Sequence, residues 1–169
     1  MSGYRLLVTG SRTWTDKSAI GRAFAWAVGE FPGVIVQGEH GPRALWDRVT
    51  VVHGGARGAD MLAGRLARVW GMGVEPHPVT SRDWEAWCPG CTAGHRRERP
   101  DGSTYCPQAG NRRNQRMVDL GADLCIGFPS GPGWSGTRDC LNRAAEGGIR
   151  VVDWPAEGAA LLAAVGIAS

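Results

Sequence analysis

Lysine is almost absent from this chain, and long hydrophobic runs are absent altogether. Of the 19 basic residues, 18 are arginines and Lys17 is the single lysine. We attribute this bias to a GC-rich genome, with a chemical role for arginine as the alternative. No apolar stretch approaches the roughly 18 residues of a membrane-spanning helix, and no signal peptide precedes the first predicted strand. The sequence therefore predicts a cytoplasmic protein with no membrane partner, in the host cytoplasm if the gene is viral.

Strong charge of either sign is also missing. The formal net charge is only +3, which by itself does not predict nucleic-acid binding. Cys88 to Arg116 is more basic, because it holds six arginines against Glu98 and Asp101. The five cysteines, in a reducing compartment, predict metal ligands or free thiols rather than disulfides. With 169 residues and 43% hydrophobic content, the chain is sufficient for one domain over 1–169 with its own core.

Short β-rich runs alternate with helical patterns along the chain. The runs expected to be core strands are 4–9, 49–52, 74–79, 123–128 and 150–153. This alternation predicts an α/β fold with a mostly parallel, doubly wound sheet. Pro76 and Pro78 place the third run at a sheet edge. We interpret residues 33–47 as a hairpin-like excursion, and residues 81–110, which are polar and turn-rich, as an inserted Cys/His loop.

Two glycine-rich turns each follow an apolar run. In a parallel sheet, such turns leave the carboxyl end of a strand, and their amides together with the next helix form a seat for phosphate. The alternative is a tight strand-to-helix turn without a ligand. The candidate ligand residues of the first turn are Gly54, Gly55, Ala56, Arg57, Gly58 and Asp60. Those of the second turn are Gly131, Gly133, Ser135, Gly136 and Thr137.

A third candidate segment follows the first strand. Thr9, Gly10 and Ser11 would lie at the same sheet edge, where Arg12 can bind an anion and Trp14 can stack on a base. The alternative is a helix-capping region with a buried Trp14. For Asp60 of the first turn, the sequence leaves two roles open, accepting a ribose hydroxyl or capping the helix.

Four metal-ligand residue types gather in the inserted loop. Cys88 and Cys91 form a CxxC pair, and His95 and Cys106 follow within the same segment, which has few apolar residues. This donor set is typical of tetrahedral zinc, and a metal would explain how such a loop is ordered. A redox CxxC pair, or free thiols beside a surface histidine, are the alternatives.

A basic run, Arg112 to Met117, is predicted to begin a helix. Arg113 and Arg116 share one helix face at i, i+3 spacing, and Asn114 lies between them. This set can clamp a phosphate or polarise a glycosidic bond. The alternative is a solvated basic face.

These motifs, in this order, resemble the YspA-type branch of the SLOG superfamily. The segments that carry the resemblance are 8–12, 53–60, 113–118, and 128–129 with 131–137. The branch is known chiefly as a domain of unknown function in actinobacteria and their phages. The resemblance implies a Rossmann-like fold that binds a nucleotide or nucleotide-derived ligand, and frequent homo-oligomers. Related families are the "lonely guy" phosphoribohydrolases and the DNA-processing protein A.

The chain departs from the phosphoribohydrolase motif Pro-Gly-Gly-x-Gly-Thr-x-x-Glu. Gly136 and Thr137 match its Gly-Thr, but Cys140 stands where the motif has Glu, and Asp139 comes one position early. The leading hypothesis is therefore a nucleotide sensor or sequestering module without chemistry. An N-glycosidase or phosphoribohydrolase is the alternative, with Asp139, Asp60 and Arg113 as catalytic candidates. A second alternative is a single-stranded nucleic-acid-binding module that uses the arginines of the inserted loop.

Overall fold

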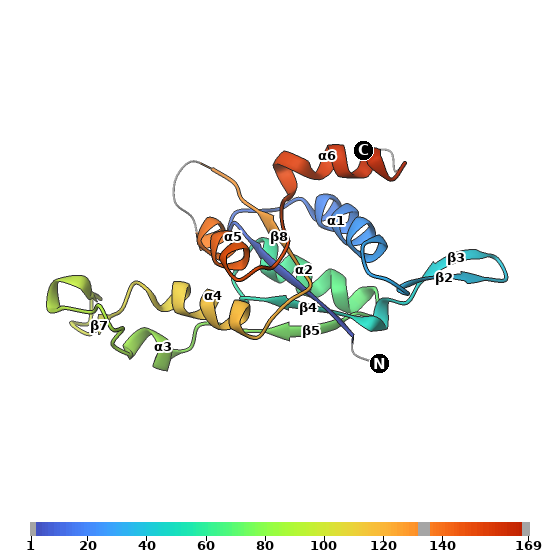
Figure 1. The fold of residues 1–169 in the computed structure, drawn as a ribbon. Coiled ribbons are helices and arrows are strands. Elements are labelled where there is room, and N and C mark those ends of the chain that lie inside the picture. Colours follow the sequence, from blue (N-terminus) through green and yellow to red (C-terminus); the bar gives the residue numbers. More distant parts are fainter. Residues whose placement is uncertain (1–2, 132–135, 167–169) are drawn as a thin grey trace.

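The computed structural model describes residues 3–131 and 136–166, and within them a parallel sheet forms the centre of the molecule (Figure 1). Its strands are β1 (Tyr4–Gly10), β4 (Val49–His53), β5 (Gly73–Pro76), β8 (Leu124–Phe128) and β9 (Val151–Asp153). They lie in the order β5-β4-β1-β8-β9, and each pairs in parallel with its neighbour. Numbered among themselves, the strands follow the Rossmann order 3-2-1-4-5, with the switch point between β1 and β8. The predicted doubly wound sheet and the edge position of β5 are confirmed.

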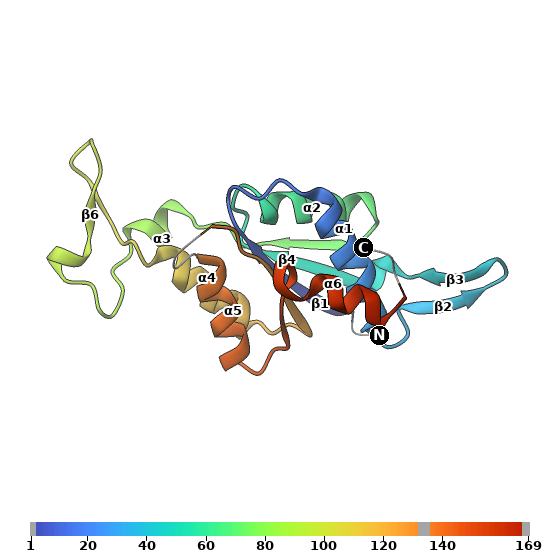
Figure 2. The ribbon, with the colours of Figure 1, turned by 90° about the horizontal axis from the view of Figure 1, so that it is seen from above.

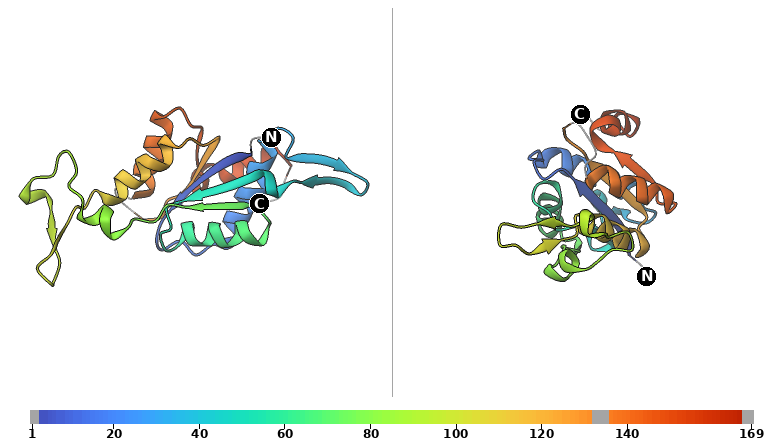
Figure 3. Two further views of the ribbon diagram at one scale, coloured as in Figure 1. Left: turned by 90° about the horizontal axis from the view of Figure 1, so that it is seen from below. Right: turned by 90° about the vertical axis from the view of Figure 1, so that its left-hand side faces the viewer.

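Helices cover both faces of this sheet (Figure 3). The helices α1 (Lys17–Gly29), α2 (Ala59–Val69) and α6 (Trp154–Ala164) pack on one face, and α4 (Ala109–Asp119) and α5 (Gly136–Glu146) pack on the other. Residues of β1 alternate between the two sides, because Leu6 and Val8 join the larger core while Leu7 joins the smaller one. Since both faces are buried, β1 and β8 read as continuous apolar runs.

Local sequence signals set where helices begin. Asp16 caps α1, and its carboxylate accepts the amide of Ala19 at 2.9 Å. Pro155 occupies the first turn of α6, where its missing N–H costs nothing. No helix among residues 3–131 and 136–166 has the length and apolar character needed to cross a bilayer.

Two segments project from opposite ends of the molecule (Figure 2). One is the antiparallel hairpin of β2 (Ile35–Gly38) and β3 (Gly41–Ala44), which agrees with the predicted excursion and leads through a 3-10 turn (Trp46–Arg48) into β4. The other is the Cys/His arm, residues 81–108, at the carboxyl edge of the sheet. The arm holds α3 (Ser81–Glu85), a 3-10 turn (Ala93–His95), β6 (Arg97–Glu98) and β7 (Thr104–Tyr105).

Gly10 is the point where β1, α2 and β8 come closest together. A Cβ at Gly10 would overlap the Cβ of Ala59 and lie 3.0 Å from the Cβ of Phe128. The end of β1 can therefore pass between α2 and β8 only because this residue has no side chain.

We expect Gly10→Ala to lower the free energy of unfolding by roughly 1–3 kcal/mol, because the added methyl overpacks this crossing. Urea denaturation followed by circular dichroism would measure the change. Gly29→Ala is the matched control, since nothing lies within 4 Å of a Cβ placed at Gly29. Equal urea midpoints for the two variants would contradict the tight crossing.

Candidate functional site

A cavity of about 400 Å³ opens at the carboxyl ends of the central strands. It lies at the switch point between β1 and β8, where open α/β sheets bind their ligands. Four segments far apart in the sequence meet there: the loop after β1, the start of α2, the end of the Cys/His arm with the start of α4, and the start of α5. The lining residues are Thr9, Gly10, Ser11, Arg12, Ala56, Asp60, Trp84, Pro107, Gly110, Asn111, Arg113, Asn114, Gly136 and Thr137.

The amides of the first glycine turn are used inside the protein. Gly55 donates to Nδ1 of His53 at 3.0 Å, and Ala56 donates to the carboxylate of Asp60 at 3.3 Å. Ala59 donates to the carbonyl of Ser11 at 3.2 Å. The amides of Gly55 and Ala56 are therefore already engaged, and phosphate binding at this turn stays a prediction. Asp60 accepts an amide of the turn that precedes α2, while α2 itself begins without a side-chain cap. The role of Asp60 toward a ribose hydroxyl stays a prediction.

Asp60 is a buried carboxylate in the wall of the cavity, with only 3% of its surface exposed. Burial raises its pKa to about 6, although the charge of Arg113 and hydrogen bonds from the backbone of Ala56, Gly54 and Gly10 act in the opposite direction. The site thus contains a carboxyl group that titrates near neutral pH.

Arg113 reaches across the cavity floor from α4. Its guanidinium donates to the carbonyls of Gly54 and His77, the latter at 3.2 Å, and its Nε donates to Oδ1 of Asn114 at 3.0 Å. Burial lowers the pKa of Arg113, while the Asp60 charge opposes that shift. A Cβ at Gly54 would overlap this guanidinium, so any larger residue there would displace Arg113 from its present position.

Asn114 ties the start of α5 to α4. Its side-chain amide donates to the carbonyl of Gly136 at 3.0 Å and to Oδ2 of Asp139 at 2.9 Å. Asp139 also pairs with Arg143 at 3.0 Å and does not line the cavity. This position argues against Asp139 as a catalytic carboxylate, because its side chain is held between α4 and α5.

The remaining predicted ligand residues fall into three groups: some line a second hollow, some line neither hollow, and some lie outside the described residues. Trp14, Arg57 and Gly58 line a second hollow beside the first, and Arg12 lines both. Gly55, with a φ of 68°, and Gly131, with a φ of 82°, line neither hollow. Gly133 and Ser135 lie outside the described residues.

Sequence reasoning missed four residues that line the cavity: Trp84, Pro107, Gly110 and Asn111. Asn111 had a detectable signal, since it directly precedes the Arg112–Asn114 run at the start of a predicted helix. Trp84 and Pro107 lie at the two ends of the Cys/His arm and Gly110 lies in α4; their meeting at the sheet edge is a tertiary feature that no local pattern indicates.

The four predicted metal ligands come together in the Cys/His arm. The Sγ atoms of Cys88 and Cys91 are 2.9 Å apart, and Cys91 and Cys106 are 3.3 Å apart. Nε2 of His95 lies 3.8 Å from Cys88 Sγ and 4.0 Å from Cys106 Sγ. Tetrahedral zinc bonds of standard length would place such donors roughly 3.5–3.8 Å apart. The cluster can therefore hold a metal ion.

Arg112 and Arg116 brace this arm. Arg112 donates to Cys106 Sγ at 3.0 Å and to the carbonyl of Asp83 at 2.5 Å, and Arg116 pairs with the Asp83 carboxylate at 2.7 Å. Burial disfavours the Cys106 thiolate, but hydrogen bonds from Arg112 and Cys91 lower its pKa to about 6. The phosphate-clamp role considered for Arg116 is thus replaced by a structural one.

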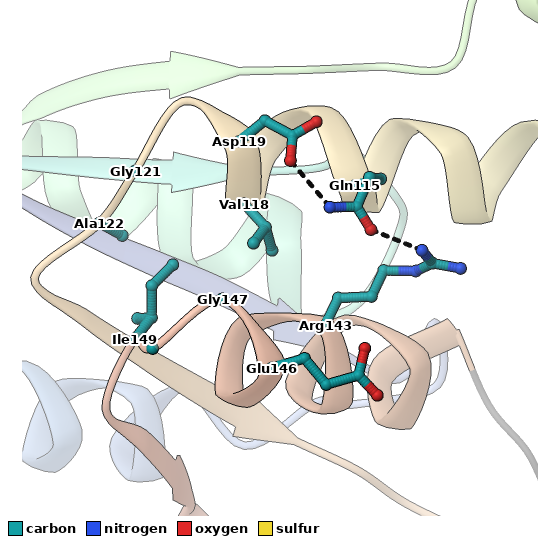
Figure 4. Close-up of a pocket in the computed structure, with 10 residues that line it drawn as sticks. Gln115, Val118, Asp119, Gly121, Ala122, Arg143, Glu146, Gly147 and Ile149 are labelled. Carbon is teal, nitrogen blue, oxygen red and sulfur yellow. Dashed lines mark hydrogen bonds between the residues drawn. The ribbon is translucent and has the colours of Figure 1, made fainter.

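A larger hollow of about 570 Å³ lies elsewhere, between the carboxyl-terminal ends of α4 and α5 (Figure 4). Several of its polar groups bond to one another, since Gln115 donates to Asp119 at 2.8 Å and accepts from Arg143 at 2.6 Å. None of the predicted site residues lines it. The candidate site is therefore the smaller cavity at the strand ends.

Comparison with known proteins agrees with this architecture. No family model matches the chain. Among solved structures, the chain is similar to DNA processing protein A (DprA) from Streptococcus pneumoniae, with a TM-score of 0.56 and 18% sequence identity. The match covers 98% of this chain but 57% of the DprA chain, and it shows the shared Rossmann-like fold.

A closer sequence relative comes from a bacteriophage. The chain is 36% identical over 154 residues to the gene 61 protein of Mycobacterium phage D29, covering 89% of this chain and 95% of that protein. The chain belongs to the same protein family as this phage protein.

The raised pKa of Asp60 makes stability depend on pH. Between about pH 4 and pH 6, the folded protein keeps a proton on Asp60 that the unfolded chain has released, so the stability contributed by this group falls as the pH rises. Relative to Asp60→Asn, the wild type should lose roughly 2–3 kcal/mol of unfolding free energy between about pH 4 and pH 7. Urea titrations of both proteins across this range would measure it. A pH-independent difference would contradict the shift.

Proposed function

We propose that the protein binds a nucleotide or a nucleotide-derived phosphoribosyl ligand in the cavity at the strand ends, as a sensor or sequestering module. The observation that carries this proposal is the convergence of Arg12, the start of α5 and the β1 loop on one cavity at the switch point. The N-terminus of α5 favours an anion through the helix dipole. The resemblance to the YspA-type SLOG branch supports the same ligand class.

Each part of a nucleotide has a suitable neighbour in this cavity. Gly136, Thr137 and Arg12 suit the phosphate, since they offer amides, a hydroxyl and a guanidinium. Asp60, when ionised, suits a ribose hydroxyl. Trp84 offers an aromatic surface for the base, and its ring is oriented by an edge contact with Tyr105 at 5.8 Å.

One observation favours an enzymatic alternative. Asp60 is buried in the cavity wall with a pKa of about 6, which suits a group that exchanges protons near neutral pH. A nucleotide N-glycosidase would release free base from a nucleoside monophosphate, and Asp60→Asn would stop the release.

A nucleic-acid alternative is favoured by the surface of the Cys/His arm. Arg96 lies over the ring of Trp87, which is 63% exposed, and Arg99 lies over the ring of Tyr105. An exposed aromatic ring beside arginine side chains suits stacking on single-stranded bases. Salt-dependent retardation of single-stranded DNA, weakened when Arg96, Arg97 and Arg99 are neutralised, would support this function.

We further propose that the metal of the arm is zinc with a structural role. Three sulfur donors and one imidazole form a closed set that leaves no protein position open for a substrate. The arm has few apolar residues, so metal coordination supplies the energy that a core would otherwise give. We also propose that residues 1–169 form one domain with this arm inserted, and that the protein assembles into a homo-oligomer.

Nucleotide binding should raise the melting temperature of the purified protein. Adenosine, guanosine, cytidine and uridine mono- and diphosphates form the test panel, read by differential scanning fluorimetry. Arg12→Ala should lower the affinity for the nucleotide that gives the shift about tenfold or more, because it removes a charged phosphate contact. Arg43→Ala, on the distant β3, is the control and should keep the shift. No shift from any nucleotide in the panel would sink the proposal.

Metal analysis of the purified protein should find close to one equivalent of zinc. Cys91→Ser should lose the metal and lower the melting temperature, because the arm loses its tetrahedral centre. Cys125→Ala is the control, since Cys125 lies in β8 outside the cluster and should leave the zinc content unchanged. Protein free of zinc and insensitive to chelators would refute the assignment.

A further inference from the structure

A second hollow of about 410 Å³ adjoins the candidate site. It lies over the start of α2 and the loop after β1. Its lining residues are Arg12, Thr13, Trp14, Thr15, Arg57, Gly58, Met61, Leu62 and Arg65. Met61, Leu62, Arg65, Thr13 and Thr15 belong to none of the motifs that define the first cavity.

The rim of this hollow is basic and uncompensated. Arg12, Arg57 and Arg65 are all exposed, and none of their side chains makes a hydrogen bond or ion pair with another residue that the structure describes. No carboxylate lines the hollow. By contrast, Arg5 pairs with Glu75 and Arg143 pairs with Asp139. Three unpaired guanidinium groups around one hollow indicate a site for an anionic group.

The wall of the hollow is apolar and includes a fixed aromatic ring. The Trp14 ring packs on Phe128 at a centroid distance of 5.3 Å, and its Nε1 donates to the carbonyl of Asp16 at 2.9 Å. Met61 is 38% exposed on α2, although it is a large apolar residue. A rigid indole and a flexible thioether together suit a flat ring such as a nucleobase.

The two hollows share one lining residue. Arg12 lines both of them, and consecutive residues of the first glycine turn divide between them, with Ala56 facing the first and Arg57 the second. The backbones touch between the hollows at Gly58, where a φ of 76° and the close carbonyls of Ser11 and Arg12 exclude a side chain. The positively charged Arg12 side chain therefore lies where the two hollows adjoin.

We propose that the second hollow is a subsite for a second nucleoside, so that the ligand of this protein consists of two nucleosides joined through phosphate. This inference rests on the proposed nucleotide-binding function of the first cavity. Arg12 holds the linking phosphate, Arg57 and Arg65 add positive charge, and the Trp14–Met61 wall receives the second base. Such a ligand is either a pyrophosphate-linked dinucleotide or a phosphodiester step of a short single strand, and the two share this chemistry.

Isothermal titration calorimetry with three probes tests the proposal: AMP, diadenosine diphosphate and the 5′-phosphorylated dinucleotide pdApdA. The wild type should bind at least one of the two-nucleoside probes about tenfold more tightly than AMP. Arg65→Glu should abolish that advantage and leave AMP affinity unchanged, because Arg65 lies outside the first cavity. Arg43→Glu makes the same charge change on the distant hairpin and should leave all affinities as in the wild type. The preferred probe identifies the linkage.

The outcomes separate this inference from the function on which it rests. AMP binding without any advantage for a two-nucleoside probe would overturn the second subsite and leave the first cavity as proposed. An advantage that survives Arg65→Glu, or a loss of AMP binding in that variant, would likewise overturn it. No binding of any probe would remove both the subsite and the nucleotide function.

Discussion

The buried carboxylate of Asp60 is the interaction on which the site depends. Backbone groups of Gly10, Gly54 and Ala56 hydrogen-bond to it, and the charge of Arg113 faces it from α4. These groups come from the ends of β1 and β4, the turn into α2, and a helix on the other face of the sheet. One carboxyl group thus ties the end of β1 to the turn between β4 and α2. Burial of this carboxylate is unfavourable, because desolvation raises the pKa of Asp60 to about 6.

This arrangement decides where an anion can be bound. Amides that already serve Asp60 are not free for phosphate, and a phosphate beside that carboxylate would meet a like charge. Arg113 is also engaged, since its donors serve the carbonyls of Gly54 and His77. Positive potential remains at the start of α5 and at Arg12, which lines both hollows. The unpaired arginines of the second hollow extend the same region.

The sequence was sufficient for the sheet and the metal cluster but not for the roles of individual polar groups. Alternating apolar runs and the paired prolines around β5 depend on local chemistry, so they predict strands and an edge correctly. The Cys/His spacing also predicts the metal cluster correctly, because it too depends on residues close together in the sequence. The roles of Asp139 and Arg116 depend on tertiary contacts that the sequence does not reveal. Asp139 bonds to Asn114 of α4, and Arg116 pairs with Asp83 of α3. Asp60 was ambiguous because a helix cap and a ribose acceptor need the same side chain at the same position.

Residues of the Cys/His arm form part of the cavity wall, so the cysteine cluster and the cavity are structurally linked. The amide of Cys106 donates to the carbonyl of Trp84 at 2.8 Å, and Arg112 joins Cys106 Sγ to the carbonyl of Asp83. Trp84 and Pro107, on either side of that contact, line the cavity. The wall opposite α2 is therefore built from residues whose positions depend on how the cysteine cluster is held. A metal ion bound by the four clustered donors would therefore act directly on the position of this cavity wall.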